Sequence, residues 1–206
     1  MPLRNRVTPL GELIETPERG LVFGNRGRLH DEHRRIRRSY DGRRWIACRL
    51  EFRGRQREPM PPGRYTGLFF LDEATALAAG HRPCAECRRE AYNRFTSIWG
   101  AKADAIDEVL HRERLQHLHP ARLEDLPDGA FVLEDEAPFL VVGDELLRWT
   151  PGGYTERRAR RRGKVTLITP PSTVRVLQAG WETDLSLFHP RAETEAELCQ
   201  GAKGES

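Results

Sequence analysis

The sequence predicts an α+β protein, in which a small N-terminal sheet with helices is followed by a β-rich C-terminal half. Three observations support this prediction. Gly and Pro interrupt short alternating runs up to residue 70, helix-type periodicity follows, and short apolar runs separated by turn residues return after Pro120. A chain of 206 residues is long enough for one good-sized domain or two small ones.

The first element group consists of short strands and turns between Leu10 and Phe70. Residues 45–52 are one example of these short strand-like runs. Glycines and the Pro61-Pro62-Gly63 turn break the remaining runs. We therefore expect several strands of only a few residues each.

Three helices are expected next. Asp72 is a good N-cap and Gly80 suits the C′ position, so residues 72–80 should form a two-turn helix. A second helix is expected to begin beside Cys84 and to run to Trp99, and a third to cover residues 104–118.

The C-terminal half is expected to be mainly strands. The candidates are Ala130–Leu133, Phe139–Val142, Glu145–Thr150, Lys164–Thr169 and Thr173–Gln178. We therefore divide the chain into a half over residues 1–100, a connecting helix over 101–120, a β-rich half over 121–192 and a disordered tail over 193–206.

Charge is distributed unevenly along the chain. Residues 1–100 hold 20 Arg and 12 acidic residues, a net +8, whereas the rest of the chain has a net charge of −5. Arg outnumbers Lys by 31 to 3. Apolar runs reach only four or five residues, which excludes a membrane-spanning helix, and no apolar segment follows the basic start. We expect a cytoplasmic protein with no membrane partner.

The arginine clusters are compatible with nucleic acid, because a guanidinium group suits phosphates and base edges. Charge runs are also commonly plain solvated faces. Residues 157–162 are expected to form an exposed basic loop. The arginines expected to contact nucleic acid are Arg43, Arg44, Arg49, Arg53, Arg55, Arg82, Arg157, Arg158, Arg160 and Arg161.

The Cys84-x-x-Cys87 pair is the most informative motif. This spacing puts two sulfurs on one side of a tight turn, at a separation that fits two corners of a tetrahedral zinc site. One pair is half of such a site. Two free thiols in a loop, or a redox pair, are the other readings of the same motif.

The stretch from Phe69 to Cys87 resembles the Ada-type zinc domain of bacterial methylphosphotriester repair proteins. The likeness consists of an aromatic pair, an alanine-rich helix and the string Ala-Leu-Ala-Ala-Gly-His-Arg-Pro-Cys-Ala-Glu-Cys that ends at Cys87. It extends upstream to Ile46-Ala47-Cys48-Arg49, which is similar to the segment around the family's methyl-accepting cysteine. The resemblance implies zinc as cofactor, DNA as partner and Cys48, Cys84 and Cys87 as ligands.

The sequence departs from the family pattern at one ligand. Phe52 stands where the family has a further cysteine, so the fourth thiolate is missing. The fourth ligand is left open among His81, Glu51, His30, His33 and Cys199, and a water would leave an open catalytic position. Three thiolates on Zn²⁺ give the site a charge of −1 instead of −2, which makes any one sulfur a poorer nucleophile.

Three functions follow from these residues. The first is a zinc-binding, nucleic-acid-binding protein. The second is an enzyme that acts on DNA, either a methyl acceptor through Cys48 as the catalytic residue or a metal-dependent hydrolase. The third is a metal-free structural or interaction module on an Ada-like fold. The sequence does not determine the oligomeric state.

Overall fold

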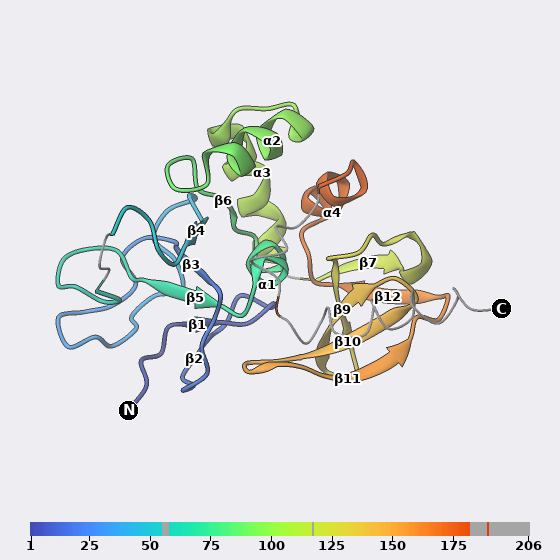
Figure 1. Ribbon diagram of the computed structural model, residues 1–206, viewed down its shortest axis with the longest axis horizontal. Helices are drawn as coiled ribbons and strands as arrows, with labels where there is room; N and C mark the ends of the chain where they lie inside the picture. Colours follow the sequence, from blue (N-terminus) through green and yellow to red (C-terminus); the bar gives the residue numbers. More distant parts are fainter. Residues whose placement is uncertain (55–57, 117, 182–188, 190–206) are drawn as a thin grey trace.

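The structure is a computed structural model that describes residues 1–54, 58–116, 118–181 and 189. It confirms the α+β class, because the described residues form four α-helices and two six-stranded sheets (Figure 1). The helices are α1 (Glu73–Ala78), α2 (Arg89–Trp99), α3 (Ala103–Gln116) and α4 (Pro171–Gln178). The strands are β1 (Arg6–Val7), β2 (Leu13–Ile14), β3 (Val22–Asn25), β4 (Ile46–Arg49), β5 (Leu68–Phe70), β6 (Arg82–Pro83), β7 (His119–Arg122), β8 (Phe131–Glu134), β9 (Ala137–Val142), β10 (Glu145–Thr150), β11 (Gly153–Ala159) and β12 (Lys164–Leu167).

The N-terminal sheet has the strand order β2-β1-β5-β3-β4-β6. Strand β3 is antiparallel to both β4 and β5, whereas β4 and β6 run parallel. All six of these strands have only two to four residues, as the frequent Gly and Pro predict. Strand β6 is one edge of the sheet, and the cysteines lie at this edge, beside β4 and β6.

The C-terminal sheet has the order β11-β10-β9-β8-β12-β7 and is antiparallel throughout. Short apolar runs separated by turn residues predict β8, β9, β10 and β12 close to their observed positions. Two strands were not predicted, β7 and β11. Arg157 and Arg158 consequently lie in strand β11 and not in an exposed loop.

Helix α1 lies between the two sheets (Figure 1). All six of its residues are buried. Ala74 and Ala78 pack with residues of the C-terminal sheet, whereas Ala76 packs with the core of the N-terminal sheet. A helix that is buried on all sides and narrow enough to fit between two sheets needs small apolar residues, which explains the alanine-rich sequence. Helix α1 therefore contributes to the cores of both halves, and the buried residues packed around it are called the shared core.

The ends of α1 are as predicted. The Asp72 carboxylate accepts a hydrogen bond of 2.8 Å from the Thr75 N–H, and Gly80 adopts a left-handed φ of 76° just beyond the helix. Asp72 also accepts a 2.7 Å hydrogen bond from the Tyr154 hydroxyl of β11. The cap of α1 thus connects the two halves of the chain.

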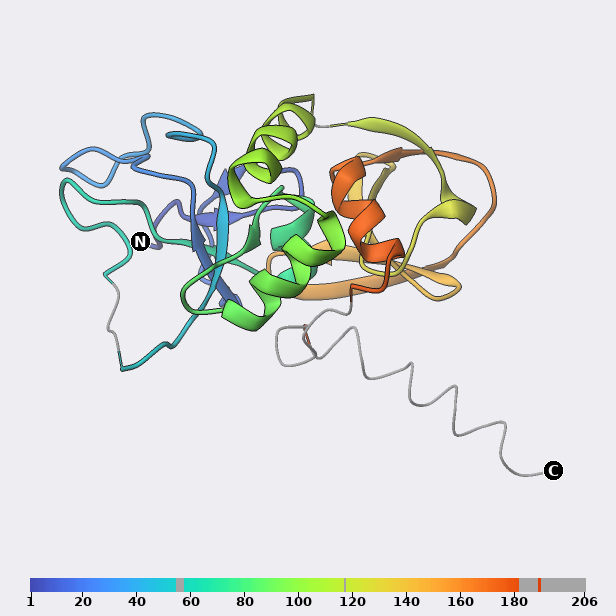
Figure 2. The ribbon, with the colours of Figure 1, turned by 90° about the horizontal axis from the view of Figure 1, so that it is seen from above.

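Helices α2, α3 and α4 contact one another, and their apolar faces pack with residues of the C-terminal sheet (Figure 2). The prediction of a strand over Thr173–Gln178 was wrong, because this segment is helix α4. Its β-branched residues favour a strand, but Pro171 opens the helix and Val174 and Leu177 meet the shared core at helical spacing. Each helix among the described residues is too short or too polar to cross a lipid bilayer.

The second predicted helix begins later than expected. Residues 84–88 form a turn, and the helix itself begins at Arg89. The Cys-x-x-Cys motif therefore precedes α2 and is not part of its first turn.

Candidate metal centre

Strand pairing at the sheet edge brings Cys48 next to the Cys-x-x-Cys turn. Ile46 and Ala47 of β4 pair with Arg82 and Pro83 of β6 in parallel register. The Cys84 N–H continues this ladder with a 2.9 Å hydrogen bond to the Ala47 carbonyl. The register thus places Cys48 and Cys84 side by side at the end of the ladder.

The turn that follows brings the third sulfur to the same place. The Sγ atoms of Cys48, Cys84 and Cys87 lie within 4.8 Å of one another. All three side chains are buried, at 5–7% exposed. They pack against Phe23 of the neighbouring strand, so an apolar wall surrounds the sulfurs on the sheet side.

Backbone N–H groups point at two of the sulfurs. The Arg49 N–H donates to Cys87 Sγ and the Glu86 N–H donates to Cys84 Sγ, both at 3.4 Å. Such donors stabilise a thiolate, which is the form that binds metal. Hydrogen bonds from the side chains of Cys48 and Cys87 lower the pKa of Cys84, whereas the contacts with Cys84 and Cys87, together with burial, raise the pKa of Cys48.

These residues fit a soft metal ion. Corners of a tetrahedral zinc–thiolate site lie about 3.8 Å apart, given a Zn–S distance of about 2.3 Å, which agrees with the spacing of this cluster. Without a cation the three sulfurs compete for protons, and a divalent cation would replace those protons. The donor set is also the one that thiophilic metals prefer. The three cysteines therefore form a site that could bind a metal ion.

The other candidate ligands do not join this cluster within the described residues. His81 is fully buried between the rings of Trp45 and Phe70, whose centroids lie 5.1 and 4.6 Å from that of its imidazole. His30 binds Thr66 at 2.6 Å, and Glu51 and His33 are exposed. Cys199 lies outside the described residues.

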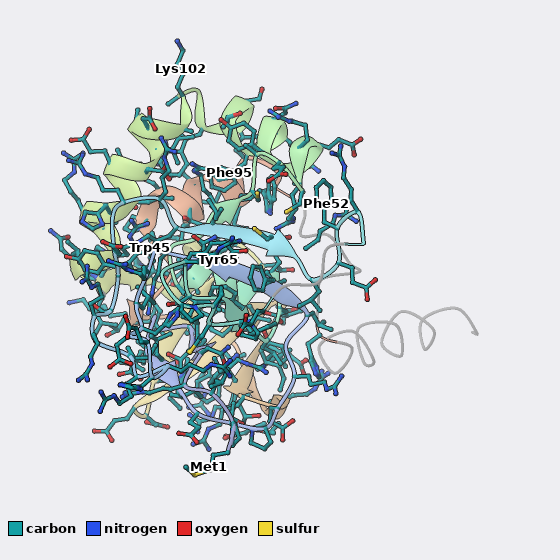
Figure 3. All side chains as sticks on the ribbon, turned by 90° about the vertical axis from the view of Figure 1, so that its left-hand side faces the viewer. Met1, Trp45, Phe52, Tyr65, Phe95 and Lys102 are labelled. Atoms are coloured by element: carbon teal, nitrogen blue, oxygen red, sulfur yellow. The ribbon has the colours of Figure 1, made fainter. Side chains whose placement is uncertain are left out.

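A cleft of about 490 Å³ borders the cluster at Cys87. Its remaining wall combines the end of β4 and the residues after it with the cysteine turn and the start of α2. These residues are Arg49, Glu51, Phe52, Arg53, Glu86, Arg88, Arg89, Glu90 and Ala91. Figure 3 shows that Phe52 lies beyond the end of β4, opposite the end at which Trp45 lies. Cys48 and Cys84 are not among the lining residues.

Of the arginines expected to contact nucleic acid, Arg49 and Arg53 line this cleft and are exposed. Arg82 is placed differently: it is 4% exposed, and it donates two hydrogen bonds, of 2.8 and 2.7 Å, to the Asp107 carboxylate of α3. Arg82 is thus buried in an ion pair, whereas Arg49 and Arg53 are exposed at the cleft. Arg82 fixes strand β6 against α3, which holds the cysteine turn in position.

The other described arginines of this set are not among the residues that line the cleft. Arg157 pairs with Glu145 at 2.6 Å, Arg158 pairs with Asp135 at 2.6 Å, and Arg160 donates to backbone carbonyls. Arg161 is exposed. Arg43 is exposed, Arg44 forms an exposed ion pair with Asp104, and Arg55 lies outside the described residues.

Arg88 and Arg89 are among the cleft residues that sequence reasoning missed. Arg88 is 3% exposed and pairs with the buried Glu73 of α1. The Arg-Arg pair that directly follows Cys87 could have identified both residues. Because the helix was predicted to begin beside Cys84, this pair was expected to lie within the helix.

Comparison of the chain with protein-family models, with curated proteins and with solved structures finds no match. The cysteine cluster and the cleft beside it are therefore the observations on which a function can be argued.

Proposed function

We propose that the protein binds zinc through Cys48, Cys84 and Cys87 and binds nucleic acid, DNA in the first instance, over the cleft beside them. The observation that carries this proposal is the double role of Cys87, which belongs both to the sulfur cluster and to the wall of an arginine-bearing cleft. A metal at the cluster would fix the turn from which the cleft wall continues.

Zinc is favoured over other thiophilic metals by the combination of a Cys-x-x-Cys turn with a third cysteine from a strand. Such sets are typical of zinc sites in which the metal supplies structure. The likeness to Ada-type zinc domains, stated above for Phe69–Cys87, supports the same ion. The ion would hold the end of β4 and the start of α2 together.

Nucleic acid is favoured by the composition of the cleft wall. Arg49 and Arg53 supply guanidinium groups, and the Arg53 guanidinium carbon lies 5.0 Å from the centroid of the Phe52 ring. Arginine beside an aromatic ring is a common surface for phosphate and base. The cleft also lies in the half of the chain that carries the net +8.

The burial of Cys48 favours nucleic-acid binding over methyl transfer to this residue. The side chain of Cys48 is 5% exposed and does not line the cleft, so a bound phosphate there would meet Cys87 first. Mass spectrometry after incubation with methylated DNA tests this point. Unchanged mass at full binding agrees with the proposal, whereas one added methyl group on Cys48 supports the enzyme reading.

Fluorescence anisotropy with a labelled 20-nucleotide DNA, at several salt concentrations, tests the proposed function. We expect log affinity to fall steeply with log salt, by about 0.7–0.9 per phosphate contact. Arg53→Gln should reduce that slope by about one contact, and Arg112→Gln, on the exposed face of α3, should leave it unchanged. A flat salt dependence of the unaltered protein would overturn the proposal.

A further inference from the structure

A small cavity lies where the two halves of the chain meet. Its volume is about 10 Å³, which is room for one water-sized or monatomic species. Its walls are formed by residues 9–11, the end of α1, Trp45, Ile168 just after β12, and Arg114 of α3. Among these lining residues Arg114 is the one with a charged side chain, so this charge lies in largely apolar surroundings.

The guanidinium end of Arg114 is the part of this side chain that lies at the cavity. Its central carbon is 3.9 Å from the centroid of the Trp45 ring, and its Nη1 donates a 3.1 Å hydrogen bond to the carbonyl of Gly80, the neighbour of the lining residue Ala79. Arg114 is 4% exposed, and its Nε is buried without a hydrogen-bond partner among the described residues. An unpaired donor therefore lies beside the cavity.

A second buried arginine, Arg26, approaches the same cavity from the end of β3. Its Nη2 donates a 2.9 Å hydrogen bond to the carbonyl of the lining residue Gly11, and its Nη1 lies 3.8 Å from the position that a Cβ on Gly11 would take. Its guanidinium carbon is 4.5 Å from the centroid of the Trp45 ring. Arg26 is 1% exposed, and its Nε also has no partner in the part of the chain that the structure describes. Two buried guanidinium groups thus lie against one lining ring.

The positive charge of these two groups is not balanced by an ion pair with any described carboxylate. Asp107 raises the pKa of Arg114, against the larger effect of burial, but the Asp107 carboxylate is already held by Arg82 at 2.7 Å. His81 adds a third buried basic group, and both of its ring nitrogens lack partners among the described residues. Because a guanidinium group stays charged when it is buried, a cluster of this kind is unstable without a negative charge.

We propose that this cavity is a halide site, which binds one chloride ion through the guanidinium groups of Arg26 and Arg114. A water molecule could accept their hydrogen bonds, but it would leave their charge unbalanced. A phosphate or carboxylate group is too large for the space. The ion would join residues 9–11, the end of α1 and α3, and so stabilise the junction of the two halves. The site shares no lining residue with the cleft at Cys87.

The first test is urea unfolding of the full chain, with chloride replaced stepwise by gluconate at constant ionic strength. If one ion binds only the folded protein, the unfolding equilibrium constant should fall tenfold for each tenfold rise in chloride above its dissociation constant. Arg26→Met and Arg114→Met should remove this dependence, whereas Arg112→Met, at an exposed position of the same helix as Arg114, should retain it. No chloride dependence in the unaltered protein, or an equal dependence in all four proteins, would overturn the proposal.

A second test does not require the variants to fold. Crystals of the unaltered protein, grown with bromide in place of chloride, should show an anomalous scattering peak inside the cavity, beside both guanidinium groups. A cavity that holds a water molecule, without an anomalous peak, would overturn the halide site.

Discussion

The buried pair of Arg82 and Asp107 should be worth far more to the fold than the nearby surface pair of Arg44 and Asp104. Asp107 and Asp104 both lie on α3, three residues apart, and each pairs with an arginine that flanks the cysteine region. Their side chains are 4% and 86% exposed, respectively. The same truncation at the two sites therefore compares a buried ion pair with a solvated one.

Asp107→Ala leaves a buried guanidinium without its carboxylate, which should lower the free energy of unfolding by about 3–5 kcal/mol. Asp104→Ala removes a surface pair and one first-turn acidic residue, so the loss should stay below about 1 kcal/mol. Replacing both partners, as Arg82→Met with Asp107→Leu, removes the uncompensated charge and should recover most of the loss.

Urea unfolding, followed by tryptophan fluorescence and far-UV circular dichroism, measures all three variants. The slope of free energy against urea should match that of the unaltered protein if the folded state is the same. Asp107→Ala and Asp104→Ala losing equal stability would refute this account of Arg82 and return that residue to the list of possible phosphate contacts.

Three further predictions concern the shared core, a buried histidine and the cysteine cluster. Tyr154→Phe removes a 2.7 Å hydrogen bond to the buried Asp72 carboxylate, so the free energy of unfolding should fall by about 1–3 kcal/mol; a loss below about 0.5 kcal/mol would contradict that link between the halves. Burial lowers the pKa of His81 well below 6.5, so a proton binds only the unfolded chain and stability should fall as the pH drops from 7 to 5, at up to about 1.4 kcal/mol per pH unit. Unfolding curves of His81→Leu at several pH values should show a smaller dependence over the same range, and an unchanged dependence would assign it to other groups. Zinc affinity, measured by competition with a coloured chelator, should drop at least about tenfold from pH 7 to pH 6, because protons compete for the thiolates.

The sequence predicted the parts of the fold that local rules control. The N-cap Asp72 and the C′ residue Gly80 define α1 through hydrogen bonding and positive φ alone, and both are found as expected. Strand β10 has its predicted bounds, Glu145–Thr150, because a short apolar run lies between two turn signals there. Where tertiary packing decides, prediction failed, as in α4, whose β-branched residues pack in a helix on the shared core.

The candidate site was predicted in its cysteines and less well in its surroundings. Cys-x-x-Cys spacing and the resemblance sufficed to group Cys48, Cys84 and Cys87. The surroundings of Arg82 and His81 depend on α3 and on Trp45, which are distant in sequence, so their burial could not be inferred from the motif. The later start of α2 is equally non-local, since the Cys84 backbone pairs with β4 instead of entering the helix.

The most direct test of the central claim is the metal content of the protein and the identity of its ligands. After equilibration with a chelator, we predict one zinc ion per chain in the unaltered protein and in Cys199→Ser, and a marked loss in Cys48→Ser, Cys84→Ser and Cys87→Ser. X-ray absorption should show sulfur ligands at about 2.3 Å. Zinc stoichiometry near zero in the unaltered protein, or retention in all three cluster variants, would contradict the account.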